Sequence, residues 1–138
     1  MILQMEDIMF SKVAEFMRCF GQHVHEEPGL KNRPTVLRYH LIQEELEELN
    51  EALSKYENGF VDEKEALIEV ADALTDILYV TLGAGHAFGI DLDACFEEVH
   101  SSNMSKLGPN GVPVRREDGK ILKGPDFREP NLEPCIWK

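Results

Sequence analysis

Three scarcities narrow the fold and function classes open to this 138-residue sequence. Its three cysteines lack CxxC spacing, which argues against a disulfide framework and for reduced thiols; they are Cys19, Cys95 and Cys135. The longest uncharged stretch, residues 77–90, is too short and too glycine-rich to span a membrane. Glu6 and Asp7 stand where a secretory signal would carry basic residues. We therefore expect a cytoplasmic protein without a membrane span.

Positive charge is also scarce. The sequence has 14 lysines and arginines against 26 aspartates and glutamates, and its formal net charge is −12 at pH 7. Because proteins that bind the nucleic-acid backbone need a basic face, this balance argues against a DNA or RNA partner. It leaves a small anionic substrate open, since divalent metal ions can lie between a nucleotide and an acidic protein.

The pattern of apolar and helix-breaking residues predicts one all-α domain over residues 1–138. Apolar spacing and capping signals indicate four helices, at about residues 4–20, 35–56, 62–88 and 91–106. Glycines and prolines exclude a long helix after Leu107, and a short hairpin could join residues 112–115 to residues 120–123 around Asp118 and Gly119. This order favours a four-helix-bundle type of fold, helical over residues 4–107 with an irregular tail at residues 108–138.

The predicted second helix carries a run of acids beside its apolar stripe. At 100° per residue, Glu45 projects between Leu41 and Leu49. Glu48 projects beside the same stripe, and Glu44 lies at its margin. A glutamate run is usually a solvated helix face, but these side chains point along an apolar surface. Their placement therefore favours a functional role.

No basic residue balances these acids on their own helices. Lysine and arginine are absent between Arg38 and Lys55, and again between Lys64 and Lys106, so the usual i,i+4 ion pairs are missing. The predicted third helix is apolar nearly all round over residues 66–82 and should be buried, with three acids on one stripe: Glu69, Asp72 and Asp76. Because an unpaired buried carboxylate is costly, we expect a divalent cation, and all-oxygen ligands favour Mg²⁺ or Mn²⁺.

These acids form a pattern that resembles a known signature. Glu44-Glu45-x-x-Glu48 followed by Glu69-x-x-Asp72 is similar to the EExxE…ExxD motif of the all-α nucleoside triphosphate pyrophosphohydrolases. That superfamily comprises the MazG-like proteins, the phosphoribosyl-ATP pyrophosphohydrolases and the dimeric dUTPases. Residues 69–79 resemble its third helix, and residues 103–107 with the basic tail resemble a MazG-like subgroup.

The resemblance implies Mg²⁺-dependent hydrolysis of a nucleoside triphosphate between the α and β phosphates, with Mn²⁺ as a substitute. The products would be a nucleoside monophosphate and pyrophosphate. By position, it assigns four metal ligands: Glu44, Glu48, Glu69 and Asp72. Glu45 would orient or deprotonate the attacking water while touching a metal, and Asn103 and Lys106 would contact the substrate. The resemblance also implies a homodimer or homotetramer.

Several other side chains are candidates for the same site. Lys106 and the tail hold the nearest basic groups in sequence, and they could fold over the phosphates; the tail groups are Arg115, Arg116, Lys120 and Lys123. Of these we expect Lys120 and Lys123 to bind substrate, with Arg116 as a further candidate. Asp76 is a candidate ligand, and His40, one turn before Glu44, is a candidate partner of a ligand.

Three alternatives remain at this point. The chain could bind a nucleotide or metal without turnover, although all five signature acids are present. It could be a phosphoribosyl-ATP pyrophosphohydrolase rather than a house-cleaning enzyme for dUTP-like or non-canonical deoxynucleotides. A di-iron carboxylate protein is the most distant alternative, because such bundles use two Glu-x-x-His motifs and this chain has one, at Glu97 and His100.

Overall fold

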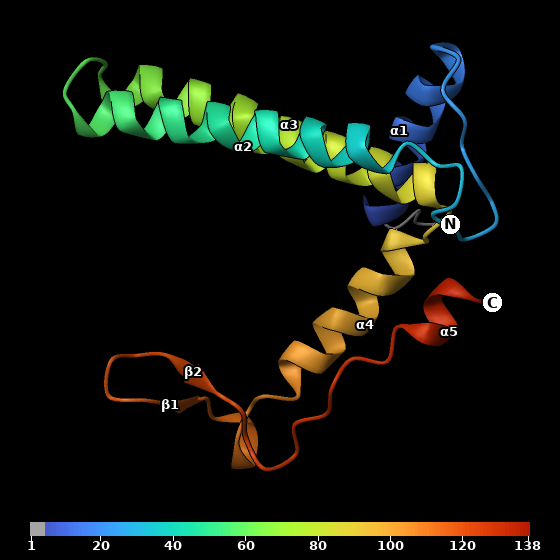
Figure 1. Cartoon of the computed structure of the whole chain (residues 1–138). Coiled ribbons are helices and arrows are strands. Elements are labelled where there is room, and N and C mark those ends of the chain that lie inside the picture. The colour runs from blue at the N-terminus through green and yellow to red at the C-terminus, as the bar shows by residue number, and fades with distance from the viewer. Residues whose placement is uncertain (1–4) are drawn as a thin grey trace. The chain divides into compact units, whose positions relative to one another are not determined.

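The computed structural model describes residues 5–138, and helices dominate it (Figure 1). The long helices are α1 (Met5–Cys19), α2 (Thr35–Glu57), α3 (Glu63–Phe88) and α4 (Leu92–Met104). The rest holds a 3-10 turn, η1 (Pro109–Gly111), the strands β1 (Val114–Arg115) and β2 (Ile121–Leu122), and the short helix α5 (Glu133–Ile136). The chain forms two compact units, which divide between Ile90 and Asp91.

In the first unit, α2 and α3 pack side by side as a long antiparallel hairpin (Figure 1). A side-chain hydrogen bond and a glycine with positive φ form the turn between them. Asn58 Nδ2 donates to the carbonyl of Ser54 at 2.8 Å, and Gly59 takes the positive φ of 76° that glycine tolerates. The Asp62 side chain then accepts a hydrogen bond from the backbone N–H of Glu65 at 2.8 Å, which confirms the predicted start of the third helix.

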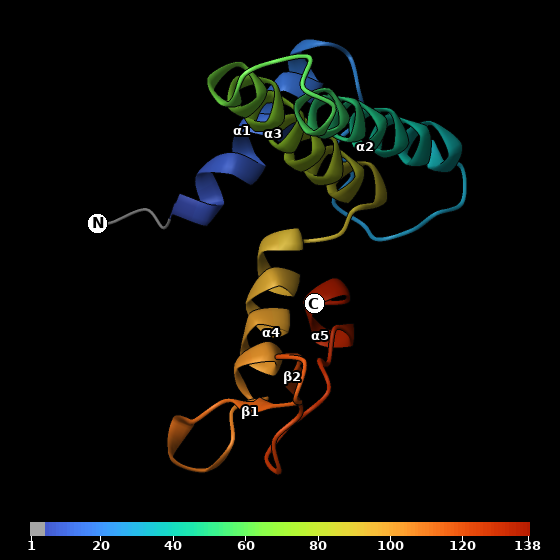
Figure 2. The ribbon, with the colours of Figure 1, turned by 90° about the vertical axis from the view of Figure 1, so that its left-hand side faces the viewer.

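The first helix, α1, packs against α3 (Figure 2). Val13 and Met17 are its buried apolar side chains. The buried His86 ring of α3 stacks on Phe10 at 3.7 Å between centroids, and its Nε2 lies 2.7 Å from the Phe10 carbonyl oxygen. Burial lowers the pKa of His86, so the neutral ring donates this hydrogen bond. These contacts attach α1 near the carboxyl end of α3.

The loop between α1 and α2 is anchored at the end of α3. Gly89 ends the helix in the left-handed region at φ 66°, and a Cβ there would lie 2.1 Å from the carbonyl oxygen of Glu27. The Arg33 guanidinium donates to the carbonyls of Ala87 at 3.3 Å and Glu27 at 3.0 Å. The close approach requires glycine, as expected for a helix stop at this residue.

In the second unit, α4 and α5 lie side by side (Figure 2). The Asp91 side chain caps α4 by accepting from the N–H of Ala94 at 3.1 Å, and it also pairs with Lys138. Arg128 Nη1 donates to Glu98 at 2.7 Å, and the N–H of Asn131 donates to the same carboxylate oxygen at 3.0 Å. These bonds bind the segment before α5 to α4.

The predicted hairpin is confirmed in shorter form. Strands β1 and β2 pair antiparallel, with Val114 opposite Leu122 and Arg115 opposite Ile121. Gly119 makes the turn at φ 88°. The all-α class with a short irregular tail is therefore confirmed, while the predicted helix start near Gln4 lies outside the described residues. No described helix has the length and apolar character that a membrane crossing requires.

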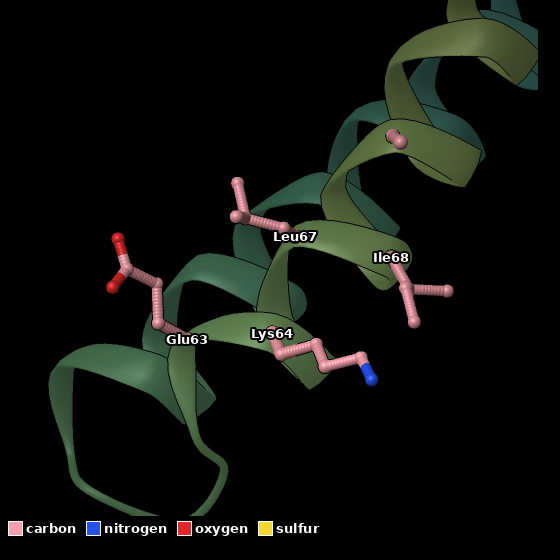
Figure 3. A pocket seen from close by; sticks show the side chains of 5 residues that line it. Glu63, Lys64, Leu67 and Ile68 are labelled. Atoms are coloured by element: carbon pink, nitrogen blue, oxygen red, sulfur yellow. The ribbon is translucent and has the colours of Figure 1, made fainter.

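One structural expectation was wrong for the single chain. The third helix is not buried all round, because α2 and α1 cover only part of its surface. Its exposed apolar residues include Leu67, Ile68, Leu74 and Leu78. Leu67 and Ile68 project from α3 beside an open hollow of about 480 Å³ that Glu63, Lys64 and Ala71 also line (Figure 3).

Candidate functional site

Three carboxylates converge on the seam between α2 and α3. One carboxylate oxygen each from Glu45, Glu48 and Asp76 lie within 4.8 Å of one another. Glu45 and Asp76 are half-buried, and Glu48 is exposed. Such a group of oxygens at one point offers the hard, anionic ligands that Mg²⁺ and Mn²⁺ prefer.

We define the acid cluster as Glu45, Glu48 and Asp76. Glu45 is the member with an unpaired buried oxygen. Its Oε2 is buried and has no hydrogen-bond partner. Burial raises the pKa of the Glu45 carboxyl, and the negative charges of Glu48, Asp76 and Glu44 raise this pKa further. An orphaned carboxylate oxygen among like charges is what a cation would relieve, so these residues fit a divalent metal.

The antiparallel packing explains why Asp76 joins the cluster. On such a hairpin, residues early in α2 face residues late in α3, so Glu45 meets Asp76 rather than the start of α3. Among the described side chains, the other predicted ligands lie outside this three-residue group: Glu44, Glu69 and Asp72.

We expected no lysine or arginine on the second, third or fourth helix to be placed to pair with these acids, and this was wrong at one position. Lys55 Nζ of α2 lies 3.8 Å from Glu69 of α3. The pair joins two helices, so helical spacing within one helix does not reveal it. Because both side chains are substantially exposed, the pair contributes little to stability.

A buried arginine lies on the same seam. Arg38 of α2 is 6% exposed, and its Nη2 donates to Gln22 Oε1 at 3.2 Å. Its Nε has no partner, and burial lowers the pKa of the guanidinium. Sequence reasoning missed this residue, although one signal was available: Arg38 precedes Glu45 by seven residues, or two helical turns, and therefore shares its face.

The predicted substrate-binding residues belong to the second unit, and the structure brings three of them together there. Asn103 is in the last turn of α4, and its carbonyl accepts from the N–H of Lys106 at 3.1 Å, just beyond the helix. The Lys106 carbonyl accepts in turn from Gly124 N–H at 2.9 Å, which brings Lys123, the residue after β2, close to the half-buried Lys106 along the backbone.

Two of the predicted tail cations already have anionic partners. Arg116 Nε donates to Asp118 at 3.0 Å, and Lys123 Nζ lies 3.4 Å from Glu129. Lys120 donates its backbone N–H to Asp118 at 3.1 Å, while its side chain is exposed. These pairs are exposed and exchangeable, so they leave the cations able to meet a phosphate.

The remaining candidates are not members of the acid cluster. His40 is exposed on α2 and contacts Tyr39 edge-on, with ring centroids 5.7 Å apart. Glu97 and His100 of α4 do not join any group of three or more potential metal ligands among the described side chains. The structure therefore gives the di-iron alternative no support.

Comparisons with known proteins place the acid cluster inside a matched region. The phosphoribosyl-ATP pyrophosphohydrolase family matches residues 13–103, which contain α2, α3 and nearly all of α4. A protein of Acanthamoeba polyphaga mimivirus, described as "Uncharacterized protein L479", is 42% identical over 109 residues. The match covers 75% of this chain and 38% of the viral protein, so the chain spans well under half of that relative's length.

Proposed function

The chain belongs to the phosphoribosyl-ATP pyrophosphohydrolase family, and we propose that it is an enzyme that hydrolyses a pyrophosphate bond of a nucleoside triphosphate. Cleavage between the α and β phosphates would consume one water and give a nucleoside monophosphate and pyrophosphate. The substrate class that we favour is a dUTP-like or non-canonical deoxynucleotide, in nucleotide-pool house-cleaning. The observation that carries the proposal is the acid cluster with its orphaned Glu45 oxygen.

The proposed metal ligands combine the structure with the signature. Glu45, Glu48 and Asp76 already present oxygens to one point. The resemblance adds Glu44, Glu69 and Asp72, which lie on the same two helices. Bound Mg²⁺, or Mn²⁺ in its place, would neutralise charge on the phosphates and acidify a bound water. A cluster of this composition suits that role because the ligands are all carboxylate oxygens.

Glu45 is the proposed catalytic base. Its pKa is raised by burial and by neighbouring negative charge, and a raised pKa makes a carboxylate a stronger proton acceptor near neutral pH. Its half-buried position also limits competition from bulk water. In this role Glu45 orients the attacking water and takes its proton, while Glu48 and Asp76 keep negative charge beside it.

The proposed phosphate-binding residues are those of the second unit: Asn103, Lys106, Lys120 and Lys123, with Arg116 as a further candidate. Lys106 is the leading one, because no ion pair engages its side chain among the described residues. Lys123 and Arg116 would exchange Glu129 and Asp118 for phosphate oxygens. In each exchange, the cation would leave an exposed carboxylate for a phosphate, which carries more negative charge.

A homo-oligomer, as dimer or tetramer, is part of the proposal. The exposed apolar residues of α3 support it, because a lone chain leaves them in water. Leu67 is 61% exposed and Ile68 is 65% exposed on neighbouring positions of one helix. A second copy would cover the hollow that they line.

Phosphoribosyl-ATP is the second candidate substrate, favoured by the matching family's description. One panel separates the possibilities: deoxynucleoside and ribonucleoside triphosphates, modified nucleotides and phosphoribosyl-ATP, each with Mg²⁺ and with EDTA. We expect Mg²⁺-dependent pyrophosphate release, strongest with a deoxynucleotide. Preference for phosphoribosyl-ATP would select the second candidate. Release of orthophosphate, or binding of Mg²⁺ and nucleotide without any turnover, would contradict the proposal.

A further inference from the structure

Arg38 is a buried cation without a buried anion. It is 6% exposed in a chain of net charge −12, yet none of the ion pairs among the described residues includes it. A guanidinium has five N–H donors, and within residues 5–138 the one side-chain acceptor that it meets is the neutral amide oxygen of Gln22, at 3.2 Å. Burying an unpaired charge is energetically unfavourable. The folded chain therefore holds an incompletely satisfied positive charge.

The surroundings make room for that charge without neutralising it. A Cβ at Gly83 would lie 2.8 Å from Arg38 Nη1 and 3.8 Å from Cζ, so the absence of a side chain there creates the space. The neutral His86 ring also lies in this region: burial lowers its pKa, and the charges of Arg18 and Arg38 lower that pKa further. No carboxylate takes part in either interaction. The guanidinium is thus buried without a carboxylate partner among the described residues.

Its position relates it to the acid cluster. Arg38 and Glu45 are seven residues apart on α2, and Asp76 and Gly83 are seven apart on α3. Each pair shares one helix face, and the offset along the axis is about 10 Å. One end of the seam therefore has an orphaned carboxylate oxygen and the other end an orphaned guanidinium nitrogen.

A single ligand class satisfies both ends. It must bind a metal ion at the carboxylates and present further negative charge towards Arg38, two helical turns away on the same face of α2. A chain of two or more phosphates offers one phosphate to the metal and another to the guanidinium. Planar guanidinium groups pair well with phosphate oxygens.

We propose that Arg38 is an anion-binding residue that takes a distal phosphate of a metal-bound polyphosphate, and that Gln22 occupies the guanidinium until that phosphate displaces it. The proposal rests on the proposed function for the metal at the acid cluster. Gln22 suits a displaceable partner because it is exposed, uncharged and in the loop between α1 and α2. A phosphate offers the guanidinium a charge-assisted bond, which is about twice as strong as a neutral one.

The probe is inorganic pyrophosphate, titrated calorimetrically into the whole chain with saturating Mg²⁺. Arg38→Gln should weaken pyrophosphate binding by roughly tenfold or more, with Mg²⁺ affinity alone unchanged. The matched control is Arg18→Gln, which removes the same charge from an exposed position in the same unit. Equal weakening by the control, or an unchanged affinity in Arg38→Gln, would overturn the proposal.

A second variant guards against misfolding of Arg38→Gln. Gln22→Glu gives the guanidinium a carboxylate partner, so the thermal midpoint of unfolding should rise while pyrophosphate binding weakens. Gln22→Ala should leave pyrophosphate affinity equal or higher. Unchanged pyrophosphate affinity in Gln22→Glu would overturn the proposal. If no nucleotide is hydrolysed but these affinities shift as expected, the proposed function fails and the anion site stands. If nucleotide is hydrolysed but the affinities do not shift, the proposed function stands and the anion site fails.

Discussion

The guanidinium of Arg38 lies against Gly83, so that a Cβ on Gly83 would approach Nη1 to 2.8 Å. This contact joins α2 to α3 two turns from the acid cluster, on the same seam. The missing side chain at Gly83 therefore leaves room for the Arg38 side chain of α2. Within α3 alone, alanine would be more stable than glycine by about 1 kcal/mol.

Gly83→Ala should therefore stabilise the folded chain by less than the usual gain of about 1 kcal/mol for a helix interior, because the new Cβ must displace the end of the Arg38 side chain. Urea unfolding followed by circular dichroism measures the change in the free energy of unfolding. The control is Arg38→Ala combined with Gly83→Ala, in which the alanine no longer meets the guanidinium and the full gain is expected. An equal change from Gly83→Ala in both backgrounds would show that the clash is not with Arg38.

Glu45→Gln should abolish most turnover while leaving the fold intact. Loss of the base is expected to lower kcat by about 10²–10⁴-fold. Without metal, the variant should melt at a higher temperature than the original chain, because it removes charge repulsion from Glu48 and Asp76. Pyrophosphate release and thermal melting in EDTA are the two measurements. Glu47→Gln, on the exposed side of α2, is the control and should change neither.

The sequence predicted the helices well because their signals are local. The cap at Asp62 and the glycine stop at Gly89 depend on residues one turn away, and both are confirmed. The burial of α3 was overestimated because periodicity shows which faces are apolar, not what covers them. Leu67 and Ile68 are apolar on every scale and yet exposed in the single chain.

The candidate site was less predictable, because it depends on register between helices. The stripe Glu69, Asp72 and Asp76 is visible in the sequence, but which member faces Glu45 is fixed by the length of the turn at Asn58 and Gly59. The same register sets Lys55 beside Glu69 and Arg38 beside Gly83. Pairings of this kind join residues more than ten positions apart and leave no periodic signal.

The variants Asp76→Asn and Asp72→Asn test which aspartate binds the metal: the one in the acid cluster of the structure or the one in the sequence signature. The carboxylate of Asp76 already lies with Glu45 and Glu48, so its loss should weaken Mg²⁺ binding at least about tenfold, or 1.4 kcal/mol. Calorimetric titration with Mg²⁺ alone measures the affinity. If Asp72→Asn weakens binding and Asp76→Asn does not, the signature residue is the ligand and Asp76 is only a neighbour.

Acid should loosen the second unit through Glu98. The N–H of Asn131 and the Arg128 guanidinium lower the pKa of the Glu98 carboxyl below its unfolded value. The stabilisation is thus complete above the ordinary glutamate pKa of about 4.3, and is lost as pH falls through the lower folded value. Fluorescence of Trp137, the single tryptophan, measures the transition. Glu98→Gln should flatten this pH dependence and Glu97→Gln should preserve it; identical acid transitions in the original chain and Glu98→Gln would exclude this carboxylate.

The exposed apolar surface of α3 tests the proposed oligomer. Ile68 is 65% exposed in the single chain, so Ile68→Asp should cost an isolated chain little stability. In an oligomer the same aspartate would be buried without a partner, which strongly disfavours association. Light scattering after size exclusion should give a dimer or tetramer for the original chain and a monomer for Ile68→Asp. Val112→Asp, at a comparably exposed apolar residue outside the long helices, is the control and should keep the original mass. A monomeric original chain at all concentrations would refute the oligomer, whereas an unchanged mass in Ile68→Asp would mean that copies associate through another surface.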